Sequence, residues 1–309
     1  MFDFRIPLGV WVKDFVNFIT EYFSIIFDVI KSIFQVFYDS VTWVVGTPPF
    51  WVIIIIIVAL AVYARGWRFG LGAAAGLFLI QFVNQWSNAM DTLALTIVAA
   101  FIAVAISIPI GIWAARSLTV SSIVKPILDF LQTMPAFVYL IPAIMLFRVG
   151  AVPGIVATIA FALAPGVRLT ELGIRGVDKE VVEAGHAFGA SPRRILRQIQ
   201  LPLAMPSIMA GVNQVIMLSL SMVVIASMVG APGLGKPIVQ SLQRIDIGLG
   251  FEAGLAVVIL AILLDRLTAT LGSGRTSSAM SIFSKAPAGN TPSDSDSVGS
   301  SPTDTVPVR

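Results

Sequence analysis

Seven long apolar runs dominate the pattern of hydrophobic and polar positions along the chain. Most of them reach the roughly 20 residues that a helix needs to cross the hydrocarbon core of a bilayer. The pattern therefore predicts an all-α integral membrane protein with about seven transmembrane helices. The runs cover residues 50–64, 69–87, 91–115, 126–147, 152–170, 203–228 and 252–271.

A different pattern precedes these runs, in residues 10–45. Spanning hydrocarbon would cost several kcal/mol for each ionisable side chain in this stretch, whereas an amphipathic helix lying in the interface keeps its polar side wet. We therefore expect residues 1–47 to form an extracytoplasmic amphipathic helix on the membrane surface. Packing of this helix on another subunit is the alternative. The polar residues recur every three or four positions, at Asp14, Asn17, Glu21, Ser24, Asp28, Lys31, Gln35 and Asp39.

Composition supports a membrane environment. Hydrophobic residues make up 57% of the 309 residues and charged residues only 12%, against about 25% charged in soluble domains, and the mean hydropathy is +0.91. The sequence pI of about 9.4 does not indicate a nucleic-acid partner, because the basic residues are spread over short loops. We expect the lipid bilayer, and no nucleic acid, to surround this chain.

Several classes of chemistry are excluded or unsupported by residue content. The chain has no cysteine and a single histidine, His186, which excludes disulfides, thiolate metal sites and multi-histidine sites. No nucleophile–base pair and no metal-binding cluster is present. We expect no catalytic, metal or cofactor site in this chain, and the N-terminus does not resemble a cleavable signal peptide.

Basic residues orient the predicted spans. Fourteen of the 20 Lys and Arg residues fall on one side of the stack of apolar runs. The positive-inside rule places that side in the cytoplasm. We therefore expect a multi-pass protein of the cell inner (plasma) membrane with its N-terminus outside and its C-terminus in the cytoplasm. Residues 273–309 are rich in Ser, Thr, Pro and Gly and are predicted to form a disordered cytoplasmic tail.

The longest loop on the predicted cytoplasmic side covers residues 177–202 and is expected to form two short helices with a tight corner. Gly189 can take the left-handed conformation that ends the first helix. Ser191 is a suitable N-cap for the second, with Pro192 in its first turn. We expect Pro202 to break the second helix where it meets the membrane.

A small apolar surface is predicted on the first of these helices. Asp178 and Glu180 suit its N-terminus, and helical spacing puts Val181, Ala184 and Phe188 on one side. Few long side chains stand around them. This pattern is typical of a docking surface for a cytoplasmic partner, with an ordinary solvated loop as the alternative.

The same loop resembles the signature of ABC importer permeases, which reads Glu-Ala-Ala, three residues, Gly, nine residues and Ile-x-Leu-Pro. Gly185 stands where the signature has its second alanine, a change that keeps a small residue but loosens a helix by roughly 1 kcal/mol. Six residues match at the signature spacings: Glu183, Ala184, Gly189, Ile199, Leu201 and Pro202.

Two further segments, residues 129–142 and 230–235, resemble permease subunits of the glycine betaine/proline family over about residues 88–271. The resemblance implies a fold of the type I ABC importer permease kind. In that fold, two N-terminal scaffold spans (48–87) would precede an ABC type-1 transmembrane core (88–272).

That resemblance also implies function and partners. Loop 177–202, including Gly185 and the six matching residues, would couple to a cytoplasmic ATP-binding cassette ATPase, which would bind the ATP. A second copy of the chain and an extracytoplasmic substrate-binding protein would complete an importer of a compatible solute such as glycine betaine or proline. A stand-alone secondary transporter or channel for a small zwitterion is the alternative, and a non-transporting membrane scaffold is a third.

Polar residues inside two of the apolar runs are candidates for lining a pathway. Residues at this depth face either a pathway or a helix partner, and the pattern does not decide between them. Pro135 and Pro142 are expected to bend the fourth run. The candidates are Asp129, Gln132 and Thr133 on one helix and Asn213, Gln214 and Ser221 on another.

Two glycine motifs have simpler explanations than the ones they suggest. Residues 230–236 have the glycine and lysine spacing of a phosphate-binding loop, but Pro237 replaces the Ser or Thr that would bind magnesium. We expect a cap-like extracytoplasmic turn there. Gly72 and Gly76 are expected to allow close packing of helices.

Overall fold

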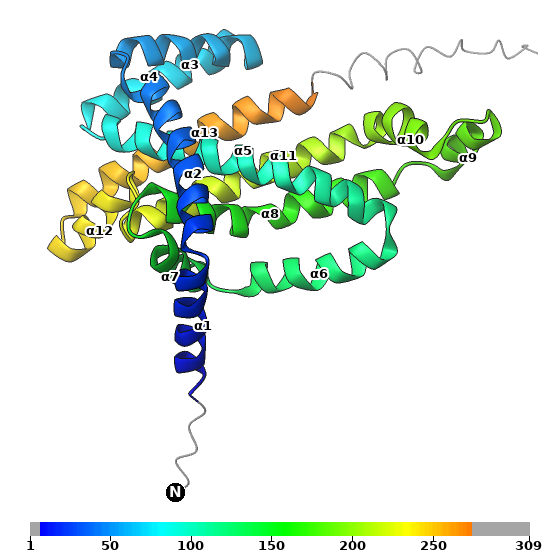
Figure 1. The fold of residues 1–309 in the computed structure, drawn as a ribbon. Coiled ribbons are helices and arrows are strands. Elements are labelled where there is room, and N and C mark those ends of the chain that lie inside the picture. The colour runs from blue at the N-terminus through cyan, green and yellow to red at the C-terminus, as the bar shows by residue number, and fades with distance from the viewer. Residues whose placement is uncertain (1–6, 274–309) are drawn as a thin grey trace, which may run out of the picture. The chain divides into compact units, whose positions relative to one another are not determined.

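The computed structural model describes residues 7–273, and within this part of the chain helices are joined by short loops and no strand occurs (Figure 1). The predicted all-α fold is confirmed for these residues. In chain order the helices are α1 (Leu8–Tyr22), α2 (Ser24–Gly46), α3 (Phe50–Arg65), α4 (Trp67–Phe82), α5 (Trp86–Arg116), α6 (Leu118–Thr133), α7 (Ala136–Phe147), α8 (Ala151–Arg175), α9 (Lys179–Ala187), α10 (Pro192–Ile195), the π-helical turn η1 (Leu196–Gln200), α11 (Leu201–Met228), α12 (Gly235–Arg244) and α13 (Ile247–Ser273).

The centre of the fold is made by α5, α8 and α11, which pack along most of their lengths. Small residues allow this close approach. A Cβ at Gly111 of α5 would lie 2.6 Å from Thr170 Cβ of α8, and one at Gly173 of α8 would lie 2.7 Å from Ser207 Cβ of α11. These contacts make α8 parallel to α5 and antiparallel to α11.

The seven predicted runs correspond in order to α3, α4, α5, the pair α6–α7, α8, α11 and α13. Four helices are long and apolar enough to cross a membrane by themselves, the segment Pro192–Met228 being one of them. The bent pairs α2–α3 and α6–α7 raise the number to as many as six, and α4 is shorter, with 16 residues.

The fourth run is not a single helix, because α6 and α7 meet at 97°. The break falls at Met134–Pro135, as the proline pattern predicts. The hydroxyl of Tyr139 lies 2.6 Å from the carbonyl oxygens of both Leu131 and Met134, so it caps the end of α6 and fixes this elbow. Pro142 lies inside α7, which continues through it as one helix, so the bend expected at Pro142 stays a prediction.

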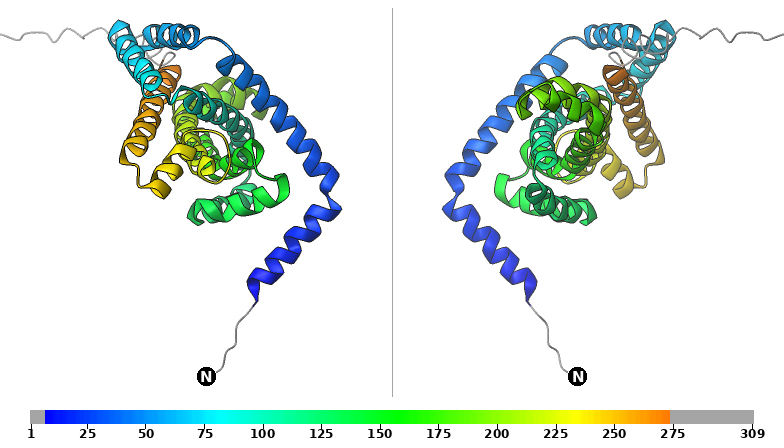
Figure 2. Two further views of the ribbon diagram at one scale, coloured as in Figure 1. Left: turned by 90° about the vertical axis from the view of Figure 1, so that its left-hand side faces the viewer. Right: turned by 90° about the vertical axis from the view of Figure 1, so that its right-hand side faces the viewer.

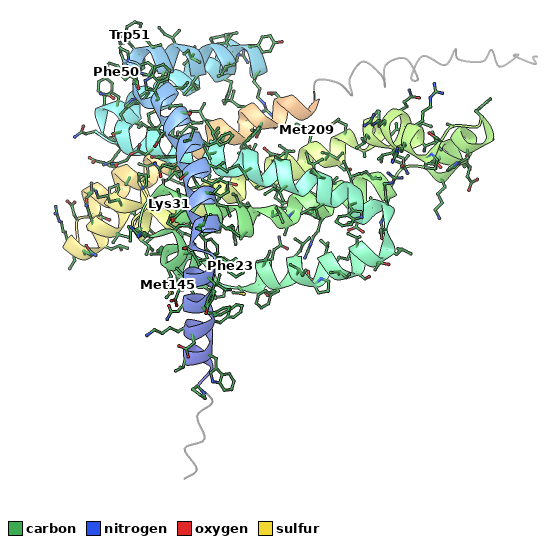
Figure 3. All side chains as sticks on the ribbon, in the orientation of Figure 1. Phe23, Lys31, Phe50, Trp51, Met145 and Met209 are labelled. Atoms are coloured by element: carbon green, nitrogen blue, oxygen red, sulfur yellow. The ribbon has the colours of Figure 1, made fainter. Side chains whose placement is uncertain are left out.

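The N-terminal polar stripe belongs to two helices and not to one. The break between α1 and α2 is at Phe23, which has φ −112° and ψ 20° (Figure 3). In the end-on view α2 lies along one edge of the bundle, and α1 turns at the break and projects beyond it (Figure 2). Helix α2 meets α3 at 96°. The membrane-surface position of this segment stays a prediction.

One face of α2 packs against α5, α7 and α8. Tyr38 is only 8% exposed and belongs to the central apolar cluster. Lys31 and Gln35 of the polar stripe are half-buried, and the side-chain amide of Gln35 donates to Asp39 Oδ1 at 2.8 Å. Part of the polar stripe therefore lies where α2 contacts the bundle, and the stripe is not uniformly exposed to solvent.

A second apolar cluster joins α3, α4 and α13 to the start of α5. Phe50, the first residue of α3, makes an edge contact with Trp86, the first of α5, with ring centroids 6.3 Å apart. Gly76 confirms the close-packing prediction, since a Cβ there would lie 2.8 Å from Ile259 of α13, whereas Gly72 has no such neighbour within 4 Å.

The predicted division into residues 1–47, 48–87 and 88–272 stays a prediction. The predicted tail, beyond Ser273, lies outside the described residues.

Candidate functional site

Helix α9 is formed and ended by local bonds in the predicted manner. The carboxylate of Asp178 accepts a hydrogen bond from the Glu180 backbone N–H at 2.9 Å and so caps the N-terminus. Gly189 has φ +77°, and the Ala190 N–H reaches back to the Gly185 carbonyl at 3.1 Å. This left-handed ending, which favours glycine, makes the tight corner that the sequence predicts.

The second predicted helix begins at Pro192, preceded by Ser191. The Ser191 carbonyl accepts from the backbone of Arg194 and Ile195, while its side chain makes no capping bond.

The expected break at Pro202 is wrong, because Pro192–Met228 is one continuous helical segment. The wider π-helical turn η1 precedes Pro202, whose missing N–H falls in the first turn of α11 and therefore interrupts little.

The corner is anchored to the membrane helices by apolar contacts. Leu196 packs with Ile174 of α8 and with Ala204 and Ile208 of α11. Gly185 faces this anchor, since a Cβ there would lie 2.8 Å from the end of the Ile199 side chain. The signature positions therefore include both the exposed helix and the residues that hold it.

The side of α9 that carries Val181, Ala184 and Phe188 is exposed and apolar. Phe188 is 91% exposed, and Val181 and Ala184 are also exposed. His186 lies on the exposed surface too, with no ion pair to a carboxylate in the described part of the chain. The predicted apolar surface thus exists, and residues 7–273 do not cover it.

Glu183 lies on another side of α9. It lines a cavity of about 310 Å³ between α9 and the C-terminal ends of α5 and α8. Arg116, Arg175 and Lys179 line the same cavity. The last turns of α5 and α8 thus place basic side chains behind the corner, where they also complement the negative ends of the helix dipoles.

A charged cluster that the sequence pattern did not reveal lies just before the corner. The Glu171 side chain is 7% exposed and lies 3.2 Å from Arg175 Nε and 3.4 Å from Lys125 Nζ. It also accepts a hydrogen bond from Ser121 at 2.7 Å, and Arg175 donates to the Ala114 carbonyl at 2.8 Å. One buried carboxylate thus ties together the ends of α5, α6 and α8.

The available signal for this cluster was the spacing of Glu171 and Arg175, four residues apart. It was missed because the predicted span ended at residue 170, whereas α8 continues as a helix to Arg175.

Three of the candidate pathway residues share an exposed face of α6. Asp129, Gln132 and Thr133 are all exposed, and Leu128 beside them is buried against α8. Asp129 forms an ion pair with Arg168 of α8. The predicted common face is present, and it includes a basic partner, Arg168.

The candidates on α11 separate into two kinds. Asn213 is half-buried and donates to Asp265 Oδ1 of α13 at 3.2 Å, and it also accepts from Thr268. Asn213 therefore has a helix partner. Gln214 and Ser221 are exposed, and the Ser221 hydroxyl bonds the carbonyl four residues earlier, at Met217.

The other end of α11 leads into the predicted glycine turn. Gly230 and Gly233 have φ +115° and +126°. Thr92 Oγ1 of α5 accepts from the Leu234 N–H at 2.8 Å, and Ser227 donates to the Pro232 carbonyl at 2.8 Å. The turn follows a helix and not a strand, so the structure agrees with a turn and not with a phosphate-binding loop.

The sequence matches a known family of membrane transport proteins. Residues 107–275 match the family described as binding-protein-dependent transport system inner membrane component. The match covers more than half of the chain and includes α8, the corner and α11.

Curated relatives match over most of the chain. The glycine betaine/carnitine transport permease protein GbuB of Listeria monocytogenes is 48% identical over 85% of this chain and 94% of its own length. The glycine betaine transport system permease protein OpuAB of Bacillus subtilis is 46% identical over 85% and 94%. The glycine betaine/proline betaine transport system permease protein ProW of Escherichia coli is 45% identical over 86% and 75%.

A solved structure supports the fold. An inward-facing MetNI methionine ABC transporter chain aligns with a TM-score of 0.56 and 21% identity, covering 60% of this chain and 93% of that one. The predicted fold of the type I ABC importer permease kind is confirmed at this level.

Proposed function

Because this chain belongs to the family of binding-protein-dependent transport system inner membrane components, we propose that it forms the translocation pathway for a small zwitterionic compatible solute such as glycine betaine or proline. The relatives named above are permeases for glycine betaine, with carnitine or proline betaine as second solutes in two of the names. Their identity to this chain, 45–48% over most of its length, supports the solute class.

The observation that carries the ATP-driven mechanism is the exposed apolar side of α9. Phe188, Val181 and Ala184 are uncovered in a corner whose backbone is fixed by Gly189 and by the anchor on α8 and α11. An exposed apolar surface of this kind marks a contact with another protein. Because the backbone of the corner is fixed, a partner bound there would transmit its movement to the membrane helices. We infer that the partner is a cytoplasmic ATPase that binds the ATP, so that this chain needs no cofactor.

Two further partners belong to the proposal. One copy of the chain leaves the polar face of α6 exposed, so a second copy is needed to enclose a pathway. An extracytoplasmic substrate-binding protein would deliver the solute to it. The residues proposed to line the pathway are Asp129, Gln132 and Thr133 of α6 with Gln214 and Ser221 of α11; Asn213 is withdrawn from this set because it bonds α13.

The proposed location is the inner (plasma) membrane, with the N-terminus outside and the C-terminus in the cytoplasm. The arrangement of basic residues supports this orientation. Reporter fusions at Phe2 and after Ser273 would test it. Reporters active on the same side would contradict the orientation.

Co-purification with an ATPase, followed by uptake, tests the function. The tagged chain should bring an ABC-type ATPase with it from its native membrane, and vesicles containing both should import glycine betaine only with ATP and the binding protein. A secondary transporter would import the solute without ATP, driven by an ion gradient. Uptake of that kind would overturn the proposal.

A further inference from the structure

The ion pair between Asp129 and Arg168 occupies an unusual position for two charges. Asp129 lies in α6 and Arg168 in α8, and their side chains are 63% and 40% exposed. Arg168 is seven residues before the end of α8, which places it about 10 Å inside the helix end at 1.5 Å per residue. The pair is therefore set back from the cytoplasmic ends of the helices and yet is not covered by the chain.

Exposure at this depth limits what the pair can face. Ionised side chains in contact with hydrocarbon are costly, and such residues face water-filled cavities or protein. Leu128, the neighbour of Asp129, turns to the apolar contact with Ala164 and Val167 of α8. The pair lies at the open edge of that contact, on the same side as Gln132 and Thr133.

A second ion pair between the same helices shows the contrast. Lys125 and Glu171 lie 3.4 Å apart, and the Glu171 side chain is buried at 7% exposure within its cluster with Ser121 and Arg175. That buried cluster already links α6 to α8. The exposed pair is thus available for a different task.

We propose that Asp129 and Arg168 form a binding site in the pathway for the zwitterion, and that their ion pair opens to receive the two charges of the solute. The guanidinium of Arg168 would bind the carboxylate, and the carboxylate of Asp129 would stand against the quaternary or secondary ammonium. This inference rests on the proposed function, because the zwitterionic solute comes from it.

The chemistry of the two partners suits such an exchange. The guanidinium offers paired N–H donors that match a carboxylate. A quaternary ammonium has no N–H, so its attraction to Asp129 is Coulombic alone. Binding breaks the ion pair within the protein and forms two ion pairs with the solute, and the net charge stays the same. Because breaking the first pair offsets part of the binding energy, the solute is held weakly enough to leave again, as a pathway requires.

An apolar cavity lies farther along α6 than the ion pair, and neither Asp129 nor Arg168 lines it. Phe130 and Leu131, the two residues after Asp129, line a cavity of about 290 Å³ with Met134 and Tyr139. Aromatic faces attract quaternary ammonium groups. The α8 side of this cavity is formed by Val156, Ala157 and Ala160, so the cavity offers an apolar surface next along the proposed pathway and not at the ion pair itself.

Uptake by matched variants tests the site. Vesicles would contain the permease, its ATPase and the binding protein, and uptake of radiolabelled glycine betaine would be measured. We expect Arg168→Gln to lower the rate on the order of 100-fold and Asp129→Asn by about tenfold. Lys125→Met, which removes the other ion pair between the same helices, should leave the rate per folded complex unchanged.

Protection of a single thiol provides a readout that a structural role would not change. Because the chain has no cysteine, Gln132→Cys gives one reactive thiol beside the pair. Glycine betaine should slow its modification in the complex trapped with vanadate and binding protein, and choline, which has no carboxylate, should not. Combining Gln132→Cys with Arg168→Gln should abolish the protection, whereas combining it with Lys125→Met should preserve it.

Other outcomes would overturn the site. Equal losses of uptake in Arg168→Gln and Lys125→Met, with equal falls in thermal stability, would make the exposed pair a structural tie. Modification unaffected by glycine betaine in the wild-type background would place the solute elsewhere. If the wild-type complex imports no zwitterion at all, the proposed function itself is refuted. If the wild-type complex imports and Arg168→Gln imports equally well, only the proposed site is refuted.

Discussion

The two corners at the ends of the continuous helical segment Pro192–Met228 are built in opposite ways. The outer corner, residues 230–235, is buried by its own chain: Leu234 is fully buried, and its N–H bonds Thr92 of α5. The inner corner, residues 188–191, holds its shape by bonds within itself and leaves Phe188 91% exposed. Both corners depend on glycines with positive φ.

Because of this difference, substitutions at the outer corner should affect stability, and substitutions at the inner corner should affect function. At the outer corner, a change in a side chain alters contacts inside the protein, so folding itself should suffer. At the inner corner the exposed side chains contact little of their own chain, so changes there should leave the fold intact and affect what binds. The predictions below test this separation.

The largest effect is expected at Gly235, the first residue of α12. A Cβ there would lie 2.0 Å from the Val224 carbonyl oxygen and 2.8 Å from the Met228 nitrogen, both backbone atoms that cannot move alone. Gly235→Val should destabilise the fold by about 3 kcal/mol or more, and thermal unfolding of the purified protein would measure this. Gly254→Val is the matched control, because nothing lies within 4 Å of a Cβ at that position. Equal stability of the two variants would contradict the closed packing of the outer corner.

The second effect concerns transport rather than folding. Ala184→Trp adds a large side chain to the exposed face of α9, so it should block the proposed ATPase contact while leaving insertion and thermal stability intact. Transport in reconstituted vesicles, and stimulation of the ATPase by the permease, should both fall by at least about tenfold.

Gly189→Val should act in the same direction through the backbone. A β-branched residue at φ +77° is strained by roughly 1–3 kcal/mol, which would misorient the exposed face. Gly189→Asn is its control, since asparagine tolerates the left-handed region. Normal import by both Ala184→Trp and Gly189→Val would mean that this corner does not transmit the ATPase movement.

A smaller effect is expected from Thr92→Val at the outer corner. The substitution leaves the buried Leu234 N–H without its acceptor at 2.8 Å, which costs about 1–3 kcal/mol. The unfolding temperature should fall, and transport should fall only in proportion to the amount of folded protein. A transport loss at unchanged stability would show that the outer corner also acts in the transport cycle.

The smallest effect is expected from Gly185→Ala, which restores the residue of the family signature. The new Cβ would lie 2.8 Å from the end of the flexible Ile199 side chain, and its next neighbour, Ile195 Cγ1 at 3.4 Å, is at an ordinary contact distance. The gain in helix propensity of about 1 kcal/mol would be offset by this adjustment, so stability and transport should both stay close to wild type. A loss comparable to that of Ala184→Trp would mean that Gly185 contributes to docking and not only to the packing of α9.

Much of this arrangement could be predicted from sequence because its causes are local. The capping carboxylate of Asp178, the left-handed Gly189 and the proline break at Pro135 each depend on a few neighbouring residues. The exposed face of α9 followed from helical spacing alone. The family signature then identified the same corner independently.

The remaining features depend on contacts between distant segments, which periodicity does not report. The Glu171 cluster joins α6 to α8, so it needs the tertiary fold and a correct end for α8. The partner of Asn213 is on α13, 52 residues away. The continuous helix through Pro202 was missed because a wider turn accommodates the proline, and no residue type specifies such a turn.

The wider turn η1 also determines the direction in which the exposed face of α9 points around the helix axis. An α-helical turn advances each residue by about 100°, so the extra residue that a π-turn holds fixes the rotational phase of α10 and the corner relative to α11. If the same residues, with none deleted, formed a regular α-helix instead, the exposed face of α9 would swing by about 100° around the helix axis. The two ends of this long segment would each stay helical, yet the surface offered to a partner would point elsewhere.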